Sequence, residues 1–183
     1  NSNYLYNLNM SILSQKTISK KVSFSGIGIH TGEQVNLNIL PALPNTGIIF
    51  IRTDLKKNNL VYPLYNNVSD TTLCTTISNE SGVKVSTIEH LMGALYGIGI
   101  DNAIIELNSQ EVPILDGSAI KFVDKINSVG LKISDQPIKI IKINEKIEIE
   151  ENDKFISIDK SNVTCDIDFE IKYSNKLISN QKN

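Results

Sequence analysis

The chain has few of the residues that mark several classes of protein. Its 183 residues include no Trp, two Cys, two Met and two His, and the 18 Lys and Arg do not outnumber the 20 Asp and Glu. Without a basic excess or a basic stripe interleaved with aromatic residues, nothing indicates binding to nucleic acid. No apolar run approaches the roughly 20 residues that a membrane-spanning helix needs. We therefore expect neither a nucleic-acid partner nor a membrane span.

The small number of cysteines and histidines also limits the sites that the chain can form by itself. Cys74 and Cys165 are far apart and have no paired spacing, so free thiols in a reducing compartment are the default expectation. A zinc site needs about three protein ligands, and the His-Glu-x-x-His spacing is missing from the sequence. Residues 1–14 are rich in Asn and lack the basic start and apolar core of a secretory signal, so we expect a disordered leader.

A helix is predicted between Ser86 and Gly99. Its apolar residues have the spacing of one buried face, at Ile88, Leu91, Met92 and Leu95. Ser86 is a suitable N-cap, and Gly97 or Gly99 can end the helix. The opposite face carries His90 and, after it, two residues with little or no side chain, Gly93 and Ala94. We expect a second element to pack closely against this small-residue face.

Glu89 and His90 stand side by side in the first turn of this predicted helix. The Ser86-x-x-Glu89 spacing fits a capping box, in which the glutamate bonds back to the N–H of the cap residue. The positive end of the helix dipole also favours an ionised carboxylate and a neutral imidazole, the states of a general base and a metal ligand. From these residues alone, Glu89 is either a cap or a base, and His90 is either a structural histidine or a ligand.

Strands are predicted before this helix. Residues 20–24 and the alternating residues 34–39 predict a hairpin, joined by a glycine-rich loop at 26–32 that contains His30. Phosphate-binding glycine loops open a helix, whereas a strand follows this one, so a dinucleotide site is disfavoured. His30 is then either a surface turn residue or a site residue. Short apolar runs at 47–51 and 103–107 predict buried strands.

A threonine-rich segment and a second helix complete the first domain. Residues 69–77 favour a strand that leads toward Ser86, so Cys74 is either a small buried apolar residue or part of a site at the start of the helix. Residues 111–118 lead into a second helix with apolar positions Ile120, Phe122, Val123 and Ile126. Asp116 or Ser118 can cap this helix and Gly130 can end it. Residues 15–134 thus predict an α+β domain with a layer of sheet and a layer of helices.

Residues 135–183 predict strands almost throughout. Strands are expected at 138–143, 147–149 and 155–158, and apolar and polar residues alternate from 163 to 172. A sheet cannot bury its apolar face without a second layer, and no helix pattern follows, so we expect an incomplete second domain, the start of a unit similar to the first. The polar ends of the chain are expected to be cut or frayed.

Five motifs occur in order between Gln15 and Val129. They are SGIGIHTG at 25–32, NTGIIF at 45–50, VSTIEHL at 85–91, GIDNA at 99–103 and EVPILDGSA at 111–119. Together they resemble the UDP-3-O-acyl-N-acetylglucosamine deacetylases, the zinc amidases of lipid A synthesis. That family has two similar α+β domains, each a sheet with helices on one side, packed helices to helices.

The resemblance implies roles for particular residues. His90 matches a Zn²⁺ ligand, Glu89 matches the general base that takes a proton from the attacking water, and His30 and Cys74 match residues near the substrate. The reaction would be zinc-assisted hydrolysis of the acetamide of UDP-3-O-acyl-N-acetylglucosamine, releasing acetate, in a cytoplasmic enzyme.

The resemblance also implies that part of the site is missing. The family's other zinc ligands, a His and an Asp one helical turn apart, lie in its second half with the histidine that donates a proton, and this chain has no third His. We expect an N-terminal part that is inactive without the C-terminal half of the same enzyme. The alternative is a degenerate, non-catalytic remnant or interaction domain with the same fold.

Overall fold

The computed structural model describes residues 14–141, 143–161, 166–173 and 180–182. It divides into two units, one up to Ile138 and one from Lys139, which are described separately. The predicted leader lies outside the described residues except for Ser14, as do Cys165 and the first part of the predicted alternating strand. The domain boundary predicted after residue 134 falls inside strand β10 (Leu131–Pro137), and the division into domains stays a prediction.

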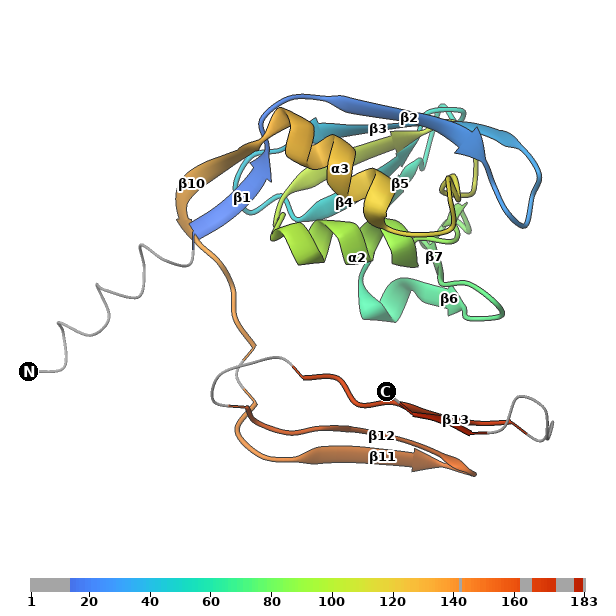
Figure 1. Ribbon diagram of the computed structural model, residues 1–183. Coiled ribbons are helices and arrows are strands. Elements are labelled where there is room, and N and C mark those ends of the chain that lie inside the picture. Colours follow the sequence, from blue (N-terminus) through green and yellow to red (C-terminus); the bar gives the residue numbers. More distant parts are fainter. Residues whose placement is uncertain (1–13, 142, 162–165, 174–179, 183) are drawn as a thin grey trace, which may run out of the picture. The chain divides into compact units, whose positions relative to one another are not determined.

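The first unit is built on a five-stranded sheet with the strand order β2-β3-β9-β4-β5 (Figure 1). These strands are β2 (Val22–Ile27), β3 (Gln34–Pro41), β9 (Ala103–Leu107), β4 (Ile48–Arg52) and β5 (Leu60–Val61). β3 pairs antiparallel with β2 and with β9, whereas β4 and β9 are parallel. The predicted hairpin and the two predicted buried strands are confirmed.

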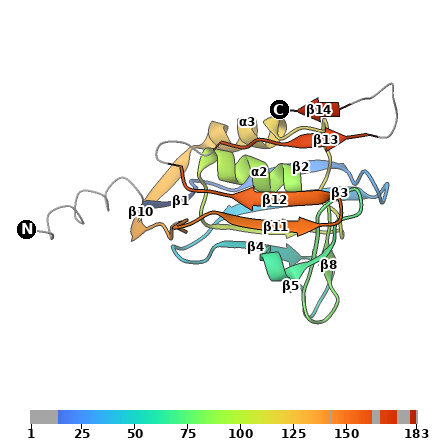
Figure 2. The same ribbon diagram turned by 90° about the horizontal axis from the view of Figure 1, so that it is seen from below.

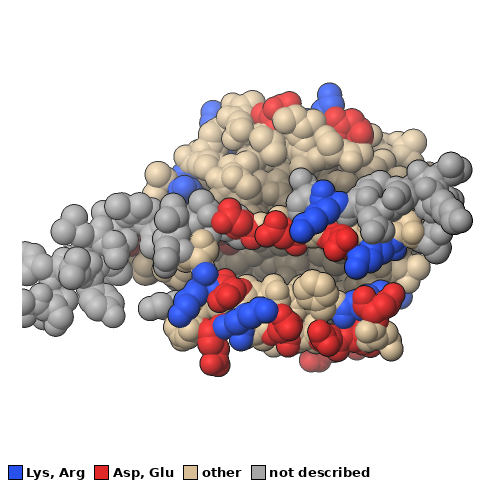
Figure 3. Space-filling view, turned by 60° about the horizontal axis from the view of Figure 1, so that its bottom comes forward, with Lys and Arg blue, Asp and Glu red and all other residues tan. Residues whose placement is uncertain are grey.

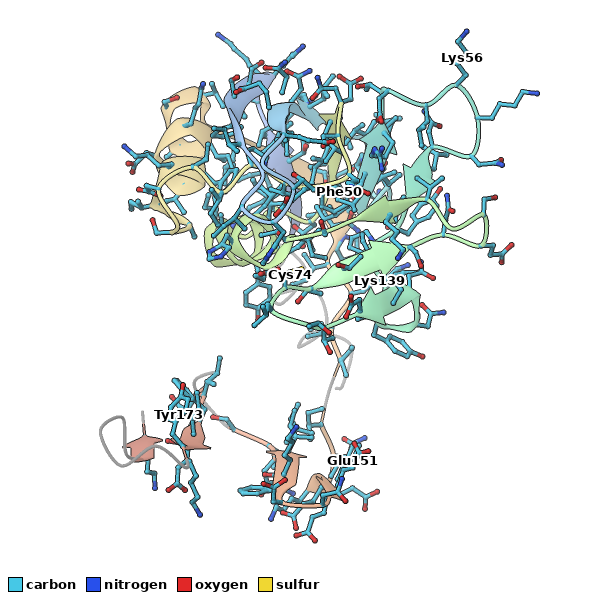
Figure 4. The ribbon with its side chains drawn as sticks, turned by 90° about the vertical axis from the view of Figure 1, so that its right-hand side faces the viewer. Phe50, Lys56, Cys74, Lys139, Glu151 and Tyr173 are labelled. Carbon is cyan, nitrogen blue, oxygen red and sulfur yellow. The ribbon has the colours of Figure 1, made fainter. Side chains whose placement is uncertain are left out.

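Two helices cover one face of this sheet. They are α2 (Glu89–Ile98) and α3 (Ile120–Val129), and the views in Figure 1 and Figure 2 place both on the same side. Alternate residues of β3 point into the core, where Leu37 and Ile39 are fully buried. Phe50 of β4 lies in the interior of the unit (Figure 4), and the rings of Phe24 and Phe122 pack with their centroids 4.9 Å apart. The unit is therefore the α+β arrangement that the sequence predicts.

A smaller sheet leads the chain into α2. A 3-10 turn (Tyr65–Asn67) precedes its three strands, which are β6 (Val68–Asp70), β7 (Thr76–Ser78) and β8 (Lys84–Val85). The turn between β7 and β8 is held by Asn79, whose side-chain oxygen accepts hydrogen bonds from the N–H groups of Ser81 and Val83, each at 3.0 Å. Strand β1 (Ser14–Ile18) pairs antiparallel with β10, so the first and last strands of the unit lie together.

The first turn of α2 differs from the predicted capping box. The helix begins at Glu89, and its N-cap residue, Ile88, makes no side-chain capping bond. The Ser86 hydroxyl instead donates to the carbonyl of Gln110 at 3.2 Å, so the interpretation of Ser86 as the cap is wrong. At the other end, Gly99 has φ 81° and its N–H bonds to the carbonyls of Leu95 and Tyr96, as the predicted glycine end requires.

The small-residue face of α2 is only partly packed within the first unit. Ala94 is 1% exposed, whereas Gly93 and Gly97 are exposed, and no described atom lies within 4 Å of the position that a Cβ would take on either glycine. The predicted close packing over Gly93 is therefore not found in the described residues. The start of α3 is closer to expectation, since the Ser118 hydroxyl oxygen accepts a bond from the Ile120 N–H at 3.2 Å.

The described part of the second unit consists of two separate strand pairs. They are β11 (Ile147–Glu151) with β12 (Lys154–Ile158), and β13 (Glu170–Lys172) with β14 (Asn180–Lys182). A tight turn follows Glu151, which pairs with Lys154 across Asn152, a residue with φ 56°. Every residue of β11 and β12 is exposed, so the predicted buried face of this sheet has no covering layer in the described unit.

The charged side chains do not form a large area of one sign on the face shown in Figure 3, where acidic and basic groups are interspersed. Across the described ranges, neither helix has the length and apolar character needed to cross a membrane.

Candidate active site

Glu89 and His90 are the first two residues of α2, and both are half-buried. The backbone N–H of Thr75 donates to Glu89 Oε2 at 3.0 Å, in place of the predicted bond to Ser86. The carboxylate therefore faces the connection between β6 and β7. Within the described parts of the chain, no hydrogen-bond donor is recorded for Glu89 Oε1, so this oxygen can accept a proton or a hydrogen bond from a ligand.

The same contact brings Cys74 to the start of α2. Cys74 immediately precedes Thr75, is half-buried, and is a free thiol. Its Sγ lies 3.7 Å from the Thr76 hydroxyl oxygen. Figure 4 shows Cys74 in the connection between β6 and β7. Because the N–H of the next residue, Thr75, bonds to Glu89, the backbone of Cys74 lies close to the Glu89 carboxylate.

Glu111, for which the sequence predicts no role, is a fully buried carboxylate with an exposed fraction of 0%. The backbone N–H of His30 donates to Oε1 at 3.1 Å, and that of Thr31 donates to Oε2 at 2.8 Å. The hydroxyls of Thr31 and Thr87 also donate, to Oε2 and Oε1 respectively, each at 2.8 Å. One side chain thus bonds both to the loop between β2 and β3 and to the residue two places before Glu89.

These hydrogen bonds keep Glu111 ionised despite its burial. Burial raises the pKa of the Glu111 carboxyl, but donation from the His30 and Thr31 backbone and from the Thr31 and Thr87 hydroxyls outweighs it, so the pKa lies below its usual value. The first unit therefore has a charged group at 0% exposure that is compensated by oriented N–H and O–H dipoles.

The surroundings of Gly28 explain why the loop between β2 and β3 has a glycine at this position. A Cβ at this position would lie 2.3 Å from Glu111 Oε2 and 2.4 Å from the Thr31 hydroxyl oxygen, which leaves no room for any side chain. Two loop N–H groups that could face a phosphate bind an internal carboxylate instead. This arrangement gives a physical reason for the glycine-rich sequence that does not involve a dinucleotide.

The four site residues predicted from the sequence thus come from three segments that meet at the start of α2. The bonds of Glu111 link the His30 loop to Thr87, and the bond from Thr75 links the Cys74 segment to Glu89. The side chain of His30 is exposed. Glu111 was missed because it lies 81 residues from His30 in the chain, and the sequence shows only a glycine at position 28, where the structure leaves no room for a side chain.

The described residues supply part of what a zinc site requires. Catalytic zinc commonly has about three protein ligands, and no group of three or more His, Cys, Asp or Glu side chains suited to a metal occurs among the described residues. His90 fits one ligand position, because it is half-buried and its ring makes no hydrogen bond among the described residues. The chain's own donors are thus compatible with one ligand of such a site.

Comparisons with known proteins agree with the resemblance. Residues 15–183 match the model of the LpxC family, described as UDP-3-O-acyl N-acetylglycosamine deacetylase. A UDP-3-O-acyl-N-acetylglucosamine deacetylase of Shewanella sp. (strain W3-18-1) is 44% identical over 144 residues, which cover 79% of this chain and 47% of the relative. One of the same name from Haemophilus ducreyi is 40% identical over 168 residues, covering 92% of this chain and 55% of the relative.

The extent of these matches is as informative as their identity. The chain spans about half the length of the curated relatives that it matches. The family model, in contrast, covers nearly all of the chain, including the loop of His30, the Cys74 segment and the start of α2. By this match, the chain belongs to the UDP-3-O-acyl-N-acetylglucosamine deacetylase family.

Proposed function

We propose that this chain supplies one side of the active site of a zinc-dependent deacetylase that hydrolyses the acetamide of UDP-3-O-acyl-N-acetylglucosamine. The observation that carries the proposal is the adjacent pair Glu89 and His90 at the start of α2, in a chain that matches the family from residue 15 to residue 183. The relatives that share this match are named as deacetylases of that substrate.

The surroundings of Glu89 suit a general base. One carboxylate oxygen is fixed by the Thr75 N–H at 3.0 Å, which orients the group, and the other has no recorded donor in the described chain. Glu89 takes a proton from the attacking water, and the water oxygen bonds to the acetamide carbon. The carbon–nitrogen bond then breaks as a proton reaches the leaving nitrogen, which gives acetate and the free amine, and the proton held by Glu89 balances that transfer.

His90 is the zinc ligand in this proposal. Its ring makes no hydrogen bond among the described residues, so a ring nitrogen is available to bind a metal. When bound, Zn²⁺ polarises the acetamide carbonyl and lowers the pKa of water. Cys74 and His30 border the substrate, from the segment held by Glu89 and from the loop held by Glu111.

The remaining ligands come from outside the described residues. We assign them to the C-terminal half of the same protein, a cytoplasmic enzyme of lipid A biosynthesis, because the relatives are about twice as long as the match. With His90 as one ligand of about three, the 183-residue chain by itself binds zinc weakly and releases no acetate.

A chimeric protein, called the joined protein below, tests this function. It consists of residues 1–183 followed by the C-terminal part of the Haemophilus ducreyi relative, and acetate release from UDP-3-O-acyl-N-acetylglucosamine is measured. We expect activity that a chelator removes and added zinc restores, whereas the isolated chain releases no acetate. A folded, zinc-loaded joined protein without activity would contradict the proposed function. Acetate release by the isolated chain would contradict the division of the site.

A further inference from the structure

Glu111 bonds to the segments that carry the proposed site residues, although it is not one of them. Its carboxylate oxygens accept hydrogen bonds from the N–H groups of His30 and Thr31 and from the hydroxyls of Thr31 and Thr87. The main chain on either side of Glu111 makes the same connections. Ser86 N–H bonds to the Gln110 carbonyl, Val112 N–H bonds to the Ser86 carbonyl, and Ile114 N–H bonds to the Ile27 carbonyl. The segment of Glu111 therefore lies between the His30 loop and the entry to α2.

Thr87 shows that the entry to α2 is held in an unfavourable conformation. It has φ 56°, which is an outlier for a β-branched residue, and it is 2% exposed. Its hydroxyl donates to Glu111 Oε1 at 2.8 Å. A strained, buried residue persists when its surroundings fix it, and strain of this kind is concentrated at functional sites. Thr87 is separated from Glu89 and His90 by a single residue, Ile88.

We propose that Glu111 is a positioning residue, which holds the His30 loop against Thr87 and so sets the place of His30 relative to Glu89 and His90. This inference rests on the proposed function, because it assigns Glu111 a part in that reaction through His30. The loop N–H groups are engaged by the carboxylate, so the substrate meets the His30 side chain rather than these backbone donors.

The first test measures amide hydrogen exchange in the 183-residue chain with Glu111→Gln. In glutamine an NH₂ group takes the place of one carboxylate oxygen. Both carboxylate oxygens of Glu111 accept hydrogen bonds, and an NH₂ group can only donate, so glutamine cannot replace both acceptors. We expect exchange at His30 and Thr31 to accelerate about tenfold or more, while exchange at Gly47 is unchanged. Unchanged protection at His30 and Thr31 would overturn the proposal.

A matched control lies at the other end of α2. Asn102 is 2% exposed, and its side chain accepts from the Gly47 N–H at 2.9 Å and donates to Gln15 at 2.9 Å. Asn102→Ala should accelerate exchange at Gly47 and leave His30 and Thr31 unchanged. Acceleration at His30 and Thr31 in this control would mean that any lost buried bond loosens the loop, which would also overturn the proposal.

The second test is a double-mutant cycle on kcat/KM in the joined protein. We expect Glu111→Gln to lower kcat/KM about tenfold when His30 is present, and by less than about twofold in the His30→Ala background, because Glu111 acts through His30. A purely structural role would give equal losses in both backgrounds, and that result would overturn the proposal. The proposal is also wrong if His30→Ala leaves kcat/KM unchanged.

The two tests separate this inference from the proposed function. If the wild-type joined protein is folded and inactive, the proposed function is wrong, and with it the catalytic part of the inference. The exchange measurements still decide whether Glu111 holds the loop. If Glu111→Gln does not fold, Thr31→Val takes its place in both tests, because it removes only the hydroxyl that lies 2.8 Å from Oε2. We expect smaller changes of the same pattern, and equal losses in both backgrounds would again overturn the proposal.

Discussion

At the scale of single residues, Gly28 has the least room for a side chain among the glycines. A Cβ would lie 2.3 Å from Glu111 Oε2, which accepts from the Thr31 N–H and hydroxyl, each at 2.8 Å, and shares the His30 N–H at 3.2 Å. We expect Gly28→Ala to lower the free energy of unfolding by about 1–3 kcal/mol, the usual effect of overpacking a buried site. Urea unfolding of the 183-residue chain measures this change. An unchanged unfolding curve would show that Glu111 moves aside freely.

The ionisation of Glu111 makes stability depend on pH in a definite direction. Its pKa is lowered from 4.5 in the folded chain, so the folded state favours the charged form. This contribution is complete above about pH 4.5 and is lost as the pH falls through the lower folded value. We expect the stability difference between wild type and Glu111→Gln to shrink in that acid range. A difference that grows on acidification would contradict the assignment.

The sequence located some of these residues better than others. Glu89 and His90 were found because they are adjacent and fall in a helical pattern that needs no distant contact. Glu111 was not found, because a buried carboxylate is uncommon and its donors are loop N–H groups 80 and 81 residues away in the chain. Spacing along the chain contains no signal for such a bond.

At the scale of elements, the extent of α2 could be predicted but its first turn could not. Periodicity describes burial within the helix, and the span predicted between Ser86 and Gly99 contains the observed helix, residues 89–98, and its glycine end at Gly99. The start depends on Ser86, which forms a parallel bridge with Glu111, a residue that local sequence does not connect to it. The capping box failed because tertiary contacts engage both of its side chains.

Two glycines of α2 should respond in opposite ways to the same substitution. Gly93 is helical with open space around the Cβ position, so Gly93→Ala should raise the free energy of unfolding by about 0.5–1 kcal/mol. Gly99 ends the helix at φ 81°, so Gly99→Ala should lower it by about 1–2 kcal/mol. Urea unfolding of both variants measures these changes. If both substitutions changed the free energy of unfolding in the same direction, the helix would not end at Gly99 as described.

At the scale of the whole molecule, the first unit follows from sequence pattern and the second does not. The two-layer unit was predictable because its strands alternate and its helices have one apolar face, and each layer buries the other. In the second unit Ile149, Phe155 and Ile156 are exposed, so no described layer fixes how those strands pack.

The central claim is that this chain provides a general base and one zinc ligand as neighbours on α2. The most direct measurement is bound zinc together with kcat for acetate release, in joined proteins with Glu89→Gln, His90→Ala, or the control Glu80→Gln, which lies in the exposed turn before β8. We predict that Glu89→Gln keeps its zinc and loses at least about a hundredfold in kcat, that His90→Ala loses both, and that Glu80→Gln loses neither. Near wild-type kcat in Glu89→Gln, or full zinc in His90→Ala, would contradict the claim.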